Sequence, residues 1–154
     1  MARTRQPVRA LTDEQRRIGA AMRELRRGVA MQRFRQRVYG ESSLDVGQHD
    51  ALDVIVLAGE VRMGDVAAAL RIEPSTATRT VARLEEAGLV ERRRGDGDAR
   101  AVVVAPTAAG IAEHEATVAN AVAAIEELLG RFSTDEQRQL ADLLGRLVEA
   151  IDDI

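Results

Sequence analysis

The chain contains 154 residues, of which 45% are hydrophobic and 2% aromatic, so we expect one globular domain with a core of leucine, valine, isoleucine and alanine. Cysteine is absent, which excludes disulfides, cysteine-rich metal sites and thiol-based redox sensing. No apolar run approaches the roughly 18 residues of a membrane span and no secretion signal opens the chain, so we expect a cytoplasmic protein without a membrane partner.

The net charge of −3 is unevenly distributed along the chain. Residues 1–40 contain 11 arginines and 3 acidic residues, whereas residues 101–154 contain 3 arginines and 10 acidic residues. Because basic charge is concentrated in separate segments, the negative total does not exclude a nucleic-acid partner.

We expect residues 1–10 to form a disordered basic arm, which either contacts phosphate groups or serves as a solubilising tail. Thr12 and Gln15 form a capping-box pattern at the start of a helix. Apolar residues then recur at helical spacing as far as Val38, which predicts a single helix of nearly 40 Å within residues 11–39. A helix of this length is too long for so small a domain to cover, so part of it needs another partner.

A second helix is expected from residue 47 to residue 58. Five of its apolar residues are expected to point inward: Ala51, Leu52, Ile55, Val56 and Leu57. His49, near its start, is expected to be a surface or capping residue, and the same holds for His114. Because two separated histidines without a local carboxylate cluster do not make a metal site, we expect no metal and no other cofactor.

Two further helices are predicted close together, over residues 64–70 and between Pro74 and Gly88. Proline favours the first position of a helix, and glycine closes helices in the left-handed conformation. Only residues 71–73 join the two helices, and so short a link indicates a helix-turn-helix.

The second helix of this motif has an apolar stripe at i, i+4 and i+7, formed by Ala77, Val81 and Leu84. Its remaining surface carries short hydroxyl and arginine side chains, which can reach base edges and phosphates in a DNA major groove. These residues are Ser75, Thr76, Thr78 and Arg79, expected at bases or nearby phosphates, and Arg83, expected at the DNA backbone. In isolation, the pattern fits an ordinary amphipathic surface helix as well.

Two extended runs, residues 89–94 and 100–105, flank a loop of turn-forming residues at 95–99. This pattern predicts a β-hairpin with arginines beside its tip. The expected fold is therefore mainly α with a small β-hairpin wing, a winged helix-turn-helix within residues 44–106.

Long helices are also predicted over residues 107–129 and after a second capping box formed by Ser133 and Glu136. Both have stripes of leucine, valine or isoleucine. Residues 11–39 and 107–154 are therefore expected to be dimerisation helices of a two-fold symmetric homodimer. The alternative is that these helices fold back onto their own chain.

Four segments in order resemble the MarR (multiple-antibiotic-resistance-regulator) family of transcription factors. They are Asp65-Val-Ala-Ala-Ala-Leu70, residues 74–92, Asp98-Ala-Arg100 and Pro106-Thr-Ala-Ala-Gly110. The resemblance extends loosely over nearly the whole chain. It implies a homodimeric regulator, expected to act as a repressor, that binds a pseudo-palindromic site in double-stranded DNA.

The resemblance also implies two sets of site residues. In the wing, Arg100 would reach the minor groove with support from Asp98, and Arg94 is a second candidate. In the cleft between the dimer helices and the winged region, family members often hold a small aromatic or lipophilic effector that releases DNA. Four residues could line this cleft or could be packing residues: Met31, Phe34, Tyr39 and His49.

The chain departs from the family pattern around the first helix of the motif. Arg62 and Gly64 replace the usual serine or threonine caps, and Arg71 replaces a common glycine. Each departure is expected to cost on the order of 1 kcal/mol locally.

Two other classes of function were weighed against a DNA-binding regulator. An enzyme would need a nucleophile, base or metal constellation, and no Ser/His/Asp arrangement or glycine-rich phosphate loop is found. The remaining alternative is a helical protein-interaction module whose winged domain does not bind DNA.

Overall fold

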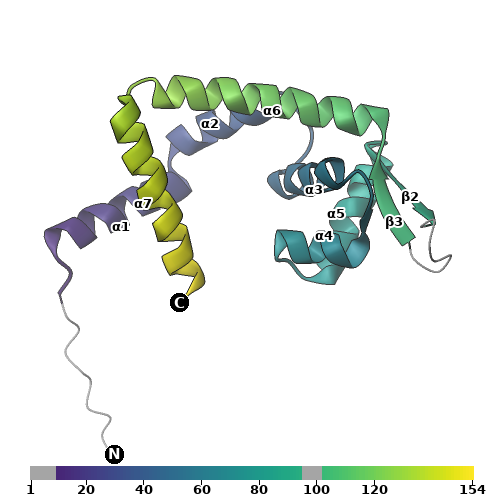
Figure 1. Ribbon diagram of the computed structural model, residues 1–154, viewed down its shortest axis with the longest axis horizontal. Helices are drawn as coiled ribbons and strands as arrows, with labels where there is room; N and C mark the ends of the chain where they lie inside the picture. The colour runs from purple at the N-terminus through teal and green to yellow at the C-terminus, as the bar shows by residue number, and fades with distance from the viewer. Residues whose placement is uncertain (1–9, 95–101) are drawn as a thin grey trace, which may run out of the picture.

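The computed structural model describes residues 10–94 and 102–154. This part of the chain is mostly helical, with one small antiparallel sheet, so the predicted fold class is confirmed (Figure 1). In chain order the elements are α1 (Asp13–Arg27), α2 (Val29–Tyr39), α3 (Val46–Ala58), β1 (Val61–Arg62), α4 (Met63–Leu70), α5 (Pro74–Glu86), β2 (Val90–Arg94), β3 (Val102–Pro106), α6 (Ala108–Leu129) and α7 (Thr134–Asp152). The long helix α6 connects the winged unit at one end to α7 at the other.

The winged unit consists of α3, α4, α5 and the sheet. In the sheet β3 lies in the centre, where Val104 is paired with Val61 of β1 and with Arg92 of β2. The predicted hairpin corresponds to β2 and β3. Strand β1 was not predicted, because two residues are too few to establish an alternating pattern.

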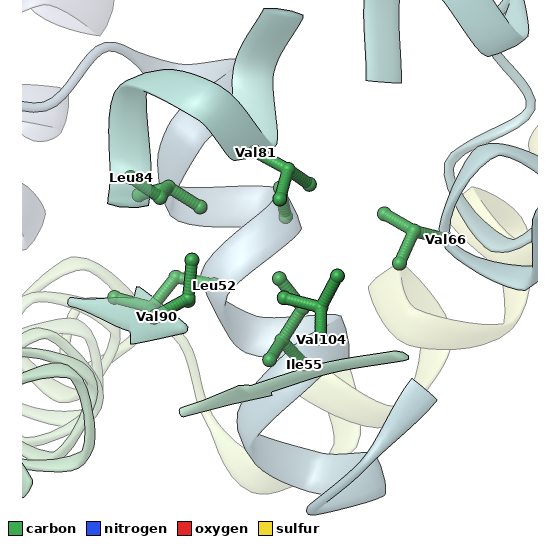
Figure 2. Packing of buried hydrophobic residues seen from close by; sticks show 8 residues of the cluster. Leu52, Ile55, Val66, Val81, Leu84, Val90 and Val104 are labelled. Carbon is green, nitrogen blue, oxygen red and sulfur yellow. The ribbon is translucent and has the colours of Figure 1, made fainter. Parts of the chain in front are cut away.

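The core of the winged unit is a cluster of aliphatic side chains between the helices and the sheet. Figure 2 shows its largest members converging from α3, α4, α5 and both strands of the hairpin. The side chains that are at most 2% exposed include Leu52, Ile55, Val66, Val81, Leu84, Val90 and Val104. The predicted stripe of α5 is confirmed, since Ala77, Val81 and Leu84 are all fully buried.

One inward prediction for α3 was wrong. Leu57 is 74% exposed, whereas Ala51, Leu52 and Ile55 are buried. Leu57 follows Ile55 by two residues, which is about 200° around a helix, so it faces away from the core.

The predicted single helix over residues 11–39 is also wrong. The capping box of Thr12 and Gln15 starts α1 as expected, but the chain leaves the helical conformation at Gly28, with φ −70° and ψ 146°. Helix α2 then begins at Val29. Glycine lacks a side chain, so it weakens helices and tolerates the close approach of Gly28 to the Glu24 carbonyl, which lies 2.5 Å from the position of a Cβ.

Helices α1 and α7 contain no buried residues, although each carries a stripe of large apolar side chains. The exposed apolar residues of α1, α6 and α7 include Ile18, Met22, Leu25, Val118, Val122, Ile125, Leu143, Leu144, Val148 and Ile151. The rest of the described chain therefore leaves these apolar stripes uncovered.

The turn between α4 and α5 has an unusual backbone. Among the described residues, Arg71 is the only residue other than glycine with positive φ, at φ 52° and ψ 42°. Its guanidinium is also 2.8 Å from a carboxylate oxygen of Asp152 at the end of α7, in an exposed ion pair. The left-handed conformation is unfavourable for residues with a Cβ, which makes Arg71 a site of local strain.

We expect Arg71→Gly to be more stable than Arg71→Ala by about 1 kcal/mol. Both substitutions remove the ion pair with Asp152, but only glycine relieves the strain at positive φ. Urea unfolding of the two variants measures the difference. Equal free energies of unfolding would contradict the assignment of strain to this residue.

Candidate nucleic-acid interface and effector cavity

Helix α5 has one buried and one exposed side. The buried stripe packs against the core, and the opposite side carries the five residues predicted to contact DNA. All five are exposed: Ser75, Thr76, Thr78, Arg79 and Arg83. The structure therefore brings these residues together on one accessible, polar and basic surface, which we call the α5 face.

Within the described part of the chain, the polar groups of the α5 face make local contacts and one exposed ion pair. The Thr78 hydroxyl donates to the Pro74 carbonyl at 2.8 Å, and Arg79 Nε donates to the Ser75 carbonyl at 3.4 Å. Arg83 Nη1 lies 3.5 Å from a carboxylate oxygen of Asp45, with both side chains more than half exposed. Exposed pairs of this kind contribute little stability, so phosphate oxygens can replace the carboxylate.

The wing begins directly after α5. Two of its arginines are engaged with carboxylates, since Arg92 Nε lies 3.5 Å from Glu85 and Arg93 Nη2 lies 3.2 Å from Glu91. Arg94 is the last residue of β2, paired in register with Val102. The predicted wing residues Asp98 and Arg100 lie outside the described residues.

A small cavity of about 200 Å³ lies where α2, α3 and α6 meet. Tyr39 and His49 stack at its wall, with ring centroids 4.3 Å apart and planes inclined by 21°. His49 is only 6% exposed, and its Nε2 has no hydrogen-bond partner among the described residues. His114 and Asp53 also line the cavity, and His114 Nε2 lies 2.8 Å from Asp53 Oδ1, which links α6 to α3.

The expectation that His49 lies at the surface was therefore wrong. It precedes the buried Leu52 by three residues, so both side chains project from the inward side of α3. The contact of Asp53 with His114 could not be predicted from local patterns, because the two residues are 61 positions apart and belong to different helices.

The four predicted effector residues do not share one cavity. Tyr39 and His49 line the small cavity, whereas Phe34 lines a second cavity of about 640 Å³ between α2 and the C-terminal half of α6. Met31 lines neither. Among the residues that the structure describes, the buried side-chain nitrogen without a hydrogen-bond partner is His49 Nε2, which belongs to the small cavity.

Burial determines the protonation of the small cavity. It lowers the pKa of His49, an effect that Glu113, Asp50 and Asp45 partly oppose. Burial raises the pKa of Tyr39, and the nearby carboxylate of Asp50 raises it further. At neutral pH the cavity therefore presents an uncharged imidazole beside an uncharged phenol.

Within residues 10–94 and 102–154, no group of three or more histidine, aspartate or glutamate side chains is arranged to hold a metal ion. In the same part of the chain, none of the helices combines the length and hydropathy required to span a membrane.

Comparison with known sequences identifies the family of this chain. The family model described as MarR family matches residues 42–101, from just before α3 to the residue before β3. The HTH-type transcriptional regulator PecS of Dickeya dadantii is 30% identical over 122 residues, which cover 77% of this chain and 74% of PecS. The uncharacterized HTH-type transcriptional regulator YdgJ of Bacillus subtilis is 30% identical over 105 residues, which cover 68% of this chain but only 64% of YdgJ.

Solved structures share the fold. Streptococcus pneumoniae FabT, solved in complex with DNA, has a TM-score of 0.77 and 23% identity, over 92% of this chain and 99% of FabT. The PcaV regulator of Streptomyces coelicolor, solved with its natural ligand, has a TM-score of 0.72 and 22% identity, over 93% of this chain and 99% of PcaV.

The helix-turn-helix, the wing strands and the long flanking helices define a winged helix-turn-helix fold, and the sequence relatives are transcriptional regulators. Within this class, the chain belongs to the MarR family, as the sequence resemblance predicted.

The buried position of His49 predicts a loss of stability in mild acid. Its pKa is lower in the folded chain than the ordinary value of 6.5, so the unfolded chain binds more protons as pH falls through this range. The free energy of unfolding should therefore decrease from pH 7.5 to pH 5.5, and His49→Gln should show a smaller decrease. Urea unfolding at the two pH values measures both. His114→Gln is the matched control, and equal pH dependence in wild type and His49→Gln would contradict the prediction.

Proposed function

We propose that the protein is a transcriptional repressor that binds a pseudo-palindromic DNA operator as a homodimer. The observation that carries the proposal is that α5 has two different sides: its apolar stripe is fully buried, and the hydroxyl and arginine residues of the α5 face are all exposed. Short polar groups and arginines near the start of an exposed helix suit the major groove. FabT, which has this fold, was solved in complex with DNA, which supports the proposal.

On this proposal, the first two turns of α5 enter the major groove. Ser75, Thr76, Thr78 and Arg79 contact base edges or nearby phosphates, and Arg83 contacts the DNA backbone. In the wing, Arg100 enters the minor groove with support from Asp98, and Arg94 is a second wing contact.

The homodimer is supported by the uncovered apolar stripes of α1, α6 and α7. Large exposed apolar surfaces on soluble proteins mark interaction sites. A second copy of the chain carries the same apolar stripes, so the helices of two copies can cover one another. A two-fold dimer would present two α5 helices about one turn of DNA apart, roughly 34 Å, so that they enter successive major grooves.

Effector release of DNA is the second part of the proposal. The small cavity combines the uncharged rings of Tyr39 and His49 with the carboxyl groups of Asp50 and Asp53 and with polar and apolar side chains of α6. Its size suits a compound with a single aromatic ring. PcaV, which shares this fold, was solved with its natural ligand. A compound bound between α2, α3 and α6 would favour one arrangement of the winged unit relative to the dimer helices.

The DNA interface predicts a charge-dependent loss of binding. Arg79→Ala and Arg100→Ala should weaken binding to a duplex selected from a random library. Each lost phosphate contact should also reduce the slope of log affinity against log salt by about one unit. Fluorescence anisotropy between 50 and 200 mM salt, roughly the range in which such contacts dominate, measures both effects.

The matched control for these variants is Arg138→Ala, which removes an exposed arginine on the side of α7 away from its apolar stripe. It should leave both affinity and slope unchanged. If the wild-type protein binds no duplex even at low salt, the chain is instead a protein-interaction module.

The effector cavity predicts that single-ring phenols lower the anisotropy of the protein–duplex complex. His49→Gln should require a higher concentration of the active compound, because the unpartnered imidazole nitrogen is lost. Phe34→Leu, in the larger cavity, is the control and should respond like wild type. Release at the same concentration from all three proteins would exclude the small cavity as the effector site.

A further inference from the structure

Thr107 lies immediately after the wing and contacts two segments at once. Its hydroxyl donates to the Gly88 carbonyl at 2.7 Å and accepts the N–H of Gly110 at 3.1 Å. Its own backbone N–H donates to the Leu89 carbonyl at 3.0 Å. One residue therefore joins the turn that follows α5 to the first turn of α6.

Gly110 brings the same two segments into direct backbone contact. It is buried, and a Cβ at this position would lie 2.0 Å from the Leu89 carbonyl oxygen and 2.9 Å from the carbonyl carbon. No side chain fits at this distance, so the backbone of α6 lies directly against the turn. We call Thr107, Gly110 and the turn 88–89 the α5–α6 clamp.

The clamp holds the closing residues of α5 itself. The N–H groups of Gly88 and Leu89 donate to the carbonyls of Glu85 and Leu84, each at 2.9 Å, and Gly88 has φ +72°. This is the hydrogen-bond pattern of a Schellman motif, so the clamped turn is a rigid extension of α5.

Helix α3 provides a second connection, because it packs against both α5 and α6. That packing consists of apolar side chains such as Leu52 together with the His114–Asp53 contact between α6 and α3. Apolar packing has no fixed direction. The hydrogen bonds of Thr107 are directional. They can therefore restrict the angle between α5 and α6 more closely than the apolar contacts do.

We propose that Thr107 and Gly110 are positioning residues that fix the orientation of α5 relative to α6, and thereby the spacing between the two α5 helices of the dimer. The orientation of α5 relative to α6 within one chain does not depend on whether the protein binds DNA. The effect of this orientation on half-site spacing rests on the proposed function.

Spin-label distances test the orientation without DNA. The chain has no cysteine, so Ser75→Cys and Glu126→Cys introduce a single labelled pair on exposed positions of α5 and α6. Labelled chains diluted into unlabelled protein then report the distance within one chain. We expect a narrow distribution for wild type and for Thr107→Ser, which retains the hydroxyl, and a broader or shifted one for Thr107→Val, which has the same shape without it. Identical distributions in all three proteins would overturn the proposal.

A second measurement tests the consequence for DNA. Wild type and Thr107→Ser should bind a duplex of the best half-site spacing more tightly than duplexes whose half-sites are one or two base pairs closer together or further apart. For Thr107→Val, the ratio of affinities between the best spacing and its neighbours should fall by about fivefold, the effect of one hydrogen bond. An unchanged ratio would overturn the role in spacing. Failure of the wild type to bind any duplex would instead reject the proposed function, while the spin-label result still decides the orientation.

Discussion

The arrangement of the molecule depends on the burial of one side of α5. Ala77, Val81 and Leu84 are fully buried, and transferring side chains the size of Val81 and Leu84 from water contributes about 1.5–3 kcal/mol each. Only one side of α5 packs against the core. Because the apolar stripe occupies that side, the residues of the α5 face lie in solvent. The same core holds the sheet, so the wing emerges beside the α5 face.

The long helices differ from α5, because their apolar stripes are not covered by the described part of their own chain. Helix α7 has no buried residue, yet Leu143, Leu144 and Val148 lie on one side of it, between 48% and 59% exposed. An apolar stripe left in water costs free energy that a second chain can remove. In the proposed dimer, the long helices that pair with a second chain are also joined to the winged units that would contact DNA.

Much of the winged unit could be predicted from the sequence because its signals are local. Pro74 and Gly88 bracket α5, the i, i+4, i+7 stripe marks its buried side, and the wing strands flank a glycine-rich loop. Three capping boxes start α1, α3 and α7, and two of them were recognised in the sequence. Local hydrogen bonds and short-range periodicity are sufficient for such features.

The features that could not be predicted depend on contacts between distant residues or on one backbone angle. The break at Gly28 interrupts an apolar repeat that continues on both sides of it, so periodicity alone could not reveal it. The burial of His49 and its stacking on Tyr39 depend on how α2 and α3 both pack against α6. For the same reason, the four residues proposed for effector binding could not be divided between two cavities before the helices were placed.

The central claim is that two copies of this chain together present two α5 faces to one duplex. The mass of the intact protein–duplex complex, measured by native mass spectrometry with a selected pseudo-palindromic duplex, tests it most directly. We expect a complex of two chains and one duplex, together with a free protein of twice the chain mass of 16.7 kDa. A free protein of single-chain mass, or a complex with one chain per duplex, would contradict it.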